Sequence, residues 1–222
     1  MMDNFIRLFV TGNQDWIVPA GFDERRFCVA DVGDAKKENH PYFAAIEEQM
    51  NNGGYEALLH HFLNVDISKV NLRSIPKTAA LLEQKIQSAT PEQGWWLETL
   101  QSGILPRGTD DPNTCLKSSL FNRYIKHADR QRVNHRSIDT MLGMFLSKHV
   151  GGLDATKVRY NSHLLNGNVV KKWANGYRFP PLKECRASFV KKLQQDIEWE
   201  DADQEWQQDP TARFPIRESF DS

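Results

Sequence analysis

The spacing of apolar residues predicts that the first half of the chain is a series of short helices. In residues 40–64 apolar side chains recur every three or four positions, and Asn51-Asn52-Gly53-Gly54 interrupts the pattern. We therefore expect two helices with a break between them. Residues 74–88 predict a third helix with Pro76 near its first turn. The face of this helix that we expect to be apolar carries Leu81, Leu82 and Ile86.

Two apolar runs near the N-terminus have the length and composition of strands instead. They are FIRLFV, residues 5–10, and FCVADV, residues 27–32. Pro19 and Gly21 predict a turn between them. Asn13 follows the first predicted strand closely, and polar residues at the end of a buried strand are typical of catalytic sites in α/β enzymes.

The second half of the chain predicts three helices, at residues 92–102, 116–130 and 137–150. Ser137 is the expected N-cap of the third helix. We expect Trp96 to be half-exposed. The residues that we expect to be buried are Trp95, Leu100, Met141, Leu142, Phe145 and Leu146. In the second of these helices, Leu120, Tyr124 and Ile125 recur at helical spacing.

Loops and a β-hairpin complete the predicted elements. Residues 103–114 are rich in Gly, Pro and Asp and predict a loop. A strand at 157–164, a tight LNGN turn and a second strand near 169–173 or 177–179 predict a hairpin. The last predicted elements are a helix at 182–193 and an acidic tail that packs poorly.

These elements predict an α+β protein that is mostly helical. Three helices closed by a hairpin have the order of the winged-helix variant of the helix-turn-helix, whose third helix enters the DNA major groove. The expected domains are residues 1–90, a winged-helix-like DNA-binding domain at 91–199 and a flexible acidic tail at 200–222.

The net charge of −1 conceals a strongly basic middle segment. Residues 117–192 carry 16 Lys and Arg against four Asp and Glu, whereas residues 1–116 carry 10 against 16 and residues 193–222 two against nine. Such asymmetry indicates a polyanion partner for the middle segment, most often nucleic acid. The alternative is a solvated basic surface that has no partner.

The basic residues fall where a winged helix contacts DNA. They lie in the turn before the third helix, near the end of that helix and on the hairpin. The candidate DNA-binding residues are Arg130, Arg132, Arg136, Lys148, Lys157, Arg159, Lys171, Lys172 and Arg178.

Asn13, Arg25 and Arg26 are candidates for a different chemistry, the hydrolysis of a nucleoside triphosphate. That reaction needs a polar residue at the end of a core strand to hold water, and a cation near the transferred phosphoryl group. Arginine suits the second role because its planar fork spans two phosphate oxygens and stays charged. The alternative is that Asn13 caps a turn and that the arginines pair with Asp23 or Glu24.

The stretch FIRLFVTGNQDWIVPAGFDERRFCVADVGD resembles motif C of superfamily 3 helicases, a strand that ends in Asn and is followed by a linker and an Arg-Arg pair. It is most similar to the version in phage and prophage primase-helicases. The likeness continues through HPYFAAIEEQMNNGGYEALLHHFLN, SIPKTAALLEQK and GWWLETLQSG to YRFPPLKECRASF, over about residues 5–199. The resemblance implies that Asn13 is a sensor, that Arg25 or Arg26 is an arginine finger and that residues 93–199 bind DNA.

The chain departs from this family in what it lacks. It has no phosphate-binding loop GxxxxGK[ST], no acidic Mg²⁺-binding strand and no primase motifs, and GGLDATK at 151–157 is no substitute. We therefore expect an α/β ATPase core that is truncated, with no cofactor in this chain alone. ATP and Mg²⁺ are implied for the intact family member.

Two main hypotheses follow. The first is a C-terminal fragment of a phage-type DNA primase-helicase, which binds DNA and adds residues to a composite ATP site. Its partner would be an upstream-encoded ATPase or primase subunit, or a homo-oligomeric ring. The alternative is a stand-alone winged-helix DNA-binding protein without enzymatic activity, an inert prophage remnant, or a module that binds an acidic protein.

Other residue patterns point away from metal, disulfide and membrane chemistry. Cys28, Cys115 and Cys185 match no metal or redox spacing and are expected to be reduced thiols. His60 and His61 point about 100° apart on a helix, which suits no single metal ion. No window approaches 18 apolar residues, so we expect no membrane partner and a cytoplasmic, prophage-encoded or bacterial protein.

Overall fold

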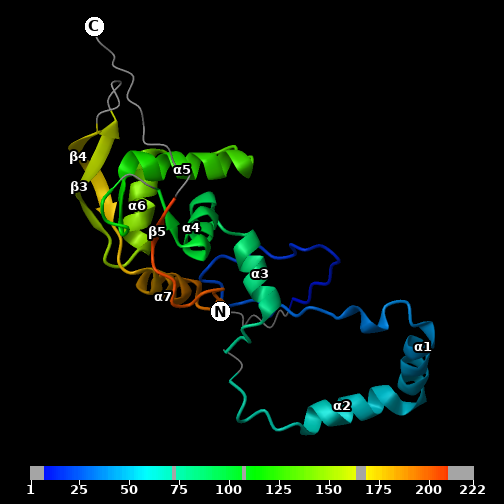
Figure 1. The fold of residues 1–222 in the computed structure, drawn as a ribbon. Coiled ribbons are helices and arrows are strands. Elements are labelled where there is room, and N and C mark those ends of the chain that lie inside the picture. The colour runs from blue at the N-terminus through cyan, green and yellow to red at the C-terminus, as the bar shows by residue number, and fades with distance from the viewer. Residues whose placement is uncertain (1–7, 72–73, 107–108, 164–168, 210–222) are drawn as a thin grey trace, which may run out of the picture. The chain divides into compact units, whose positions relative to one another are not determined.

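The computed structural model describes residues 8–71, 74–106, 109–163 and 169–209 (Figure 1). About 45% is helix and 14% is strand, which confirms a mixed α+β protein that is mostly helical. The chain divides into two compact units. We call residues 25–82 the inserted unit, and residues 1–24 with 83–222 the main unit.

The inserted unit contains two helices joined at a bend. Its elements are η1 (Asp34–Lys36), α1 (His40–Gln49), the π-helical turn η2 (Met50–Gly54) and α2 (Tyr55–Asn64). Helix α1 begins where the Asn39 side chain accepts a hydrogen bond from the Tyr42 amide, at 3.1 Å. The chain bends at Gly53, whose φ of +89° lies in the left-handed region that favours glycine. The prediction of two helices with a break at the glycines is confirmed.

The two predicted N-terminal strands are not found in the described residues. Residues 27–32 and 8–10 are outside any helix or strand, and residues 5–7 lie outside the described ranges. The backbone amides of Ile17 and Val18 donate to the side-chain oxygen of Gln84, at 2.8 and 3.2 Å. In the second run, the carbonyl oxygen of Val29 accepts a hydrogen bond from the Thr78 hydroxyl and not from a neighbouring strand. An apolar run forms a strand only where another strand pairs with its backbone, so the run alone did not decide the structure.

That helix is α3 (Ala79–Gln87), which begins three residues after Pro76 and not around it. Leu81 is buried as predicted, but Ile86 is exposed. Gln84 and Lys85 are buried instead, and the Lys85 ammonium donates to the carbonyl oxygen of Leu193 at 2.8 Å. The buried contacts of α3 are therefore made in part by the polar side chains Gln84 and Lys85, where the sequence predicted apolar side chains.

The main unit holds the remaining helices and every strand of the described chain. They are α4 (Pro91–Ser102), β1 (Ile104–Leu105), β2 (Thr114–Leu116), α5 (Lys117–Arg130), α6 (Asp139–His149), β3 (Asp154–His163), β4 (Val169–Arg178), α7 (Leu182–Leu193) and β5 (Gln207–Gln208). Strands β2, β4 and β3 form an antiparallel sheet in that order, and β1 pairs with β5 in parallel. The predicted helices and the hairpin are confirmed, whereas β1 lies in the predicted loop and β2 runs from the end of that loop to the first residue of the predicted helix. Strands of two or three residues are too short to show an alternating pattern.

The core of the main unit is built around the two adjacent tryptophans of α4. Trp95 packs edge-to-face on Tyr124 of α5, and Trp96 stacks on Phe179 with ring centroids 5.6 Å apart. Both tryptophans are only 1% exposed, so the prediction that Trp96 is half-exposed is wrong. Adjacent helical residues point in different directions, and here α4 is covered on both sides. Trp206, 110 positions further along the chain, also packs against Trp96, with ring centroids 6.1 Å apart.

The prediction of a poorly packed tail is wrong for residues 200–209. Trp206 is buried, and its indole N–H donates to the carbonyl oxygen of Pro180 at 2.7 Å. β5 then adds a strand to β1. The rest of the predicted tail, residues 210–222, lies outside the described residues.

Candidate nucleic-acid interface

Helix α6 is attached to the main unit by one side and leaves the other open. Leu142 and Leu146, four residues apart, are buried. Met141 and Met144 are 56% and 67% exposed, so the predicted burial of Met141 is wrong. Phe145 is only half-buried. Because an amphipathic helix buries a single stripe, the exposed side of α6 is available to contact a ligand.

The start of α6 is held by a polar network. Ser137 is not the N-cap, which is Ile138 without a side-chain cap. The Ser137 hydroxyl instead donates to the Glu92 carboxylate, and its amide donates to the Tyr124 hydroxyl at 3.0 Å. Burial alone would raise the pKa of Glu92, but the hydrogen bonds from Ser137 and its other donors outweigh it and hold this pKa below the usual value. The network fixes the turn before α6 onto α4 and α5.

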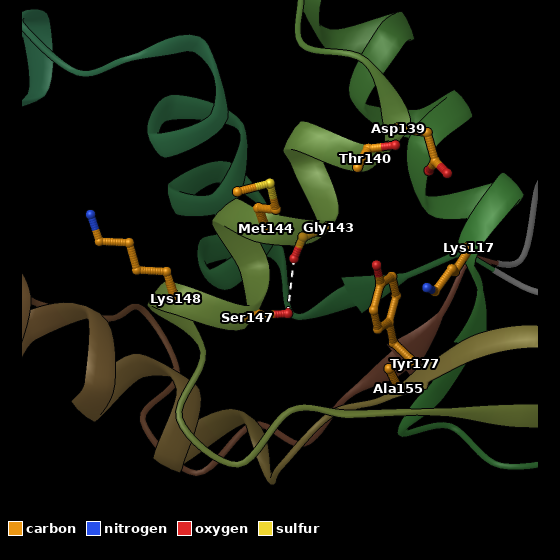
Figure 2. A pocket seen from close by; sticks show the side chains of 9 residues that line it. All are labelled: Lys117, Asp139, Thr140, Gly143, Met144, Ser147, Lys148, Ala155 and Tyr177. Atoms are coloured by element: carbon orange, nitrogen blue, oxygen red, sulfur yellow. Dashed lines mark hydrogen bonds between the residues drawn. The ribbon is translucent and has the colours of Figure 1, made fainter.

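A pocket of about 580 Å³ lies between the open side of α6 and the base of the β3–β4 hairpin (Figure 2). Its lining residues are Lys117, Asp139, Thr140, Gly143, Met144, Ser147, Lys148, Ala155 and Tyr177. A Cβ atom at Gly143 would lie 2.8 Å from the Tyr177 hydroxyl oxygen, so glycine permits α6 to approach β4 closely. The Lys117 ammonium lies 4.9 Å from the centre of the Tyr177 ring.

The register of the hairpin places part of the basic residues on one face. Arg159 is directly opposite Trp173, and Lys171 is opposite Asn161. Side chains two residues apart on a strand share a face, so Lys157 joins them. We call Lys157, Arg159, Lys171 and Trp173 the basic face. Ala155 and Tyr177, also an opposite pair, have the same parity, so the basic face continues from the α6 pocket.

The other face of the hairpin carries Lys172 and Arg178. Near its base this face also carries Val158, which is buried, so this side of the ribbon is partly covered by the main unit. The Arg178 guanidinium lies 4.0 Å from the Asp111 carboxylate. The structure thus divides the predicted hairpin cations between two faces.

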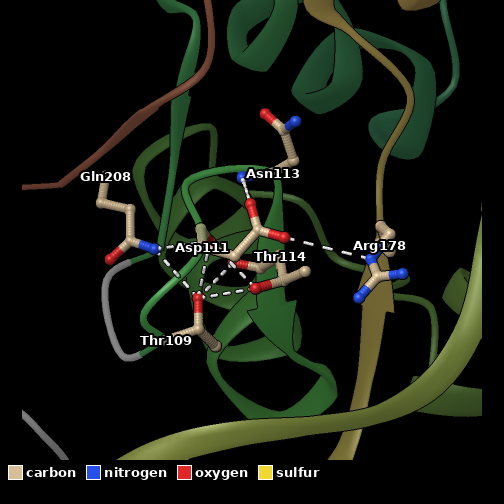
Figure 3. A network of polar contacts seen from close by, with 6 residues as sticks. All are labelled: Thr109, Asp111, Asn113, Thr114, Arg178 and Gln208. Atoms are coloured by element: carbon tan, nitrogen blue, oxygen red, sulfur yellow. Dashed lines mark hydrogen bonds and ion pairs between the residues drawn. The ribbon is translucent and has the colours of Figure 1, made fainter.

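A network of polar contacts holds the loop before β2 in place (Figure 3). The hydroxyl oxygens of Thr109 and Thr114 each lie 2.9 Å from the Asp111 carbonyl oxygen, and the Gln208 amide donates to both Thr109 and Asp111. This network holds the loop beside β3, where Thr109 forms a bridge with Tyr160.

The next loop residue, Asp110, pairs with Lys171 at 2.9 Å. The hydrogen bond from Lys171 lowers the pKa of Asp110. The carboxylate is therefore ionised at neutral pH and partly neutralises this cation of the basic face.

Two of the predicted arginines before α6 are engaged in ion pairs inside the main unit. Arg130 lies 2.7 Å from the Glu98 carboxylate, and Arg136 lies 2.6 Å from that of Asp129. Arg132 is exposed and has a φ of +53°. Lys148 is exposed near the end of α6 and lines the pocket.

The candidate ATP-site residues are at the surface. Asn13 is exposed in a bend of the main unit, just before the segment that α3 anchors. Arg25 and Arg26 are exposed and belong to the inserted unit. The three residues that the sequence grouped are therefore assigned to two different compact units.

The described part of the chain offers few other chemical groups. It contains no cluster of three or more His, Cys, Asp or Glu side chains suited to a metal ion. None of its helices has the length and hydrophobicity that a membrane crossing requires. Burial raises the pKa of the Cys115 thiol and raises that of Cys185 to about 12, so neither is a thiolate at neutral pH.

No protein-family model, curated protein or solved structure matches this chain. The functional assignment is therefore argued from the chain's own residues. Its strongest feature is the continuous surface of the α6 pocket and the basic face.

Proposed function

We propose that residues 91–199 form a winged-helix-like DNA-binding domain. The support is the order α4, β2, α5, α6, β3, β4, together with the sheet order β2-β4-β3. In this assignment α6 is the helix that enters the major groove and the β3–β4 hairpin is the wing. The short strand β2, which the sequence did not reveal, supplies the third strand of the sheet.

The observation that carries the proposal is the continuity between the α6 pocket and the basic face. Duplex DNA is recognised by cations that contact phosphates and by side chains that reach base edges in the groove. Lys157 and Arg159 provide the first kind of contact. On the open side of α6, Thr140 and Ser147 offer hydroxyl groups to base edges, and Met144 offers an apolar contact to a thymine methyl group.

A matched pair of double variants tests this assignment. Lys157→Ala with Arg159→Ala removes two cations from the basic face, whereas Lys172→Ala with Arg178→Ala removes two from the opposite face. Both variants have the same net charge. Each phosphate contact contributes about 0.9 to the slope of log affinity against log salt concentration. The Lys157→Ala/Arg159→Ala variant, which loses two such contacts, should therefore have a slope shallower by about 1.8. The Lys172→Ala/Arg178→Ala variant should change the slope much less. Equal effects of the two variants, or an affinity indifferent to salt, would contradict the proposal.

We also propose that the chain is the C-terminal part of a phage-type primase-helicase and acts in the cytoplasm of the bacterial host. The support is the sequence resemblance, together with the helices α1 and α2, which contain no buried residue. They expose large apolar side chains, among them Phe62 and Leu63. Such surfaces mark protein interaction sites, which suits a partner that carries the phosphate-binding loop.

In this second proposal Asn13 and one of Arg25 and Arg26 complete the ATP site of that partner. The chain alone is then expected to show no ATPase activity. A phosphate-loop subunit encoded upstream should co-purify with it, and Arg25→Ala with Arg26→Ala should abolish ATP turnover by the complex without preventing its assembly. Full turnover by the double variant would contradict the arginine-finger role.

A further inference from the structure

We propose that Trp173 stacks on an unpaired base, so that the basic face of the wing binds single-stranded DNA. This inference rests on the proposed DNA-binding function and names the kind of DNA that one part of the surface takes. It is carried by the exposure of Trp173 and by the cations that the hairpin register places around it.

Trp173 is exposed on the hairpin, whereas the tryptophans at the centre of the main unit are buried. Its side chain is 66% exposed, whereas Trp95, Trp96 and Trp206 are between 1% and 3% exposed. It lies in the middle of β4, opposite Arg159 of β3, so the regular pairing of these two strands fixes the face on which the side chain lies. A large apolar ring held toward solvent on an ordered strand is available for contact with a ligand.

Cations stand on three sides of the indole. Arg159 is directly opposite, where Cβ atoms are about 4.5–5.5 Å apart. Lys171 is two residues earlier on the same strand, about 7 Å along it. Lys157 occupies the diagonal position on β3. A base stacked on the indole would therefore have its own phosphate and the neighbouring phosphates within reach of positive charge.

The Trp173 indole can stack only on a base whose face is not already covered by neighbouring bases. Inside a duplex each base is covered above and below by its neighbours, whereas unpaired bases can stack on aromatic side chains. A protein partner would surround Trp173 with apolar contacts, but its neighbours on the basic face are Arg159, Lys157 and Lys171. The chemistry of this surface matches single-strand binding proteins, which combine a cationic groove with stacking platforms.

The test compares an oligo-dT strand with a blunt duplex of equal length, using the full chain and fluorescence anisotropy. Trp173→Ala is expected to weaken oligo-dT binding by about 5- to 150-fold, the range of one base–aromatic stack, and duplex binding by less than about twofold. Trp173→Phe, which keeps a ring, should restore most of the oligo-dT affinity. Val170→Ala is the matched control, because it removes an apolar side chain from the opposite face of the same strand and should change neither affinity.

The outcomes separate this inference from the proposed function. If the unaltered chain binds both DNAs in a salt-dependent way and Trp173→Ala changes neither, the stacking role is overturned and the DNA-binding domain stands. An equal loss for oligo-dT and duplex would also overturn the role. If the unaltered chain binds neither DNA, the proposed function itself fails. If it instead binds a protein partner, and Trp173→Ala abolishes that binding, the surface is a protein contact.

Discussion

Asp110 and Lys171 form an ion pair at the edge of the basic face, with 2.9 Å between the carboxylate Oδ2 and the ammonium Nζ. The pair places a negative charge where the proposed interface would receive phosphates. It also holds one of the three cations beside Trp173. This relationship leads to the first prediction.

Asp110→Asn should strengthen DNA binding. The substitution removes a negative charge and leaves Lys171 available to a phosphate, so we expect affinity at low salt to rise by about 1.5- to 5-fold, the range of an exposed ion pair. The gain should fade at high salt, because surface charges are screened. Titrations of a labelled DNA at two salt concentrations measure both effects. Weaker binding by Asp110→Asn would mean that the acid positions Lys171 for DNA instead of competing with it.

The stability of the α6 attachment should depend on the charge of Glu92. Its pKa is lowered in the folded protein, so this contribution is present above the unfolded pKa of about 4.3 and is lost as pH falls through the folded value. Glu92→Gln, which keeps the shape but cannot ionise, should melt at a lower temperature than the unaltered chain near pH 7. The difference in melting temperature should shrink as the pH is lowered below the unfolded pKa, as thermal unfolding across pH would show. If the difference in melting temperature between the two proteins is unchanged at low pH, the charge of Glu92 is not its cause.

Arg186 should be a major contributor to the stability of the main unit. Its guanidinium donates to the Leu100 carbonyl oxygen at 3.0 and 2.9 Å, to that of Asp201 at 2.6 Å and to the Gln204 side-chain oxygen at 2.9 Å. Arg186→Met leaves these acceptors without their donor, and should lower the free energy of unfolding by about 3 kcal/mol. Lys183→Met removes an exposed cation from the same helix and is the control, with an expected change within about 0.5 kcal/mol. Urea denaturation compares the two, and similar values would show that Arg186 is not a structural link.

The three cysteines should differ in reactivity. Cys28 is exposed, whereas Cys115 and Cys185 are buried and their pKa values are raised by that burial. A thiol reagent applied to the native protein should therefore modify one cysteine rapidly. Cys28→Ser should abolish this rapid reaction, and the two other thiols should react only after denaturant is added. Rapid labelling of Cys115 in the native state would contradict the burial of β2.

Local sequence was sufficient for elements whose signals lie within the element itself. The bounds of α2 and α7 follow from helical spacing and flanking residues, and the break at Gly53 follows from its conformational freedom. The sequence also placed Lys171 and Lys172 together on the hairpin, and the strand pairing then put them on opposite faces. Such signals fail when the deciding partner is distant. FCVADV has strand composition but forms no strand in this chain.

The sequence by itself determined where most helices and the hairpin form and where positive charge is concentrated, because periodicity and composition are local properties. Only the tertiary structure decided that Trp96 is buried, since the rings that pack against it include Phe179 and Trp206, which are 83 and 110 positions away. It also decided that Arg159 faces Trp173, because register depends on how two strands pair. The local pattern of residues allows several packings of the helices and several registers of the hairpin. Contacts between residues far apart in the sequence decide which of these forms, and the basic face results from the register that forms.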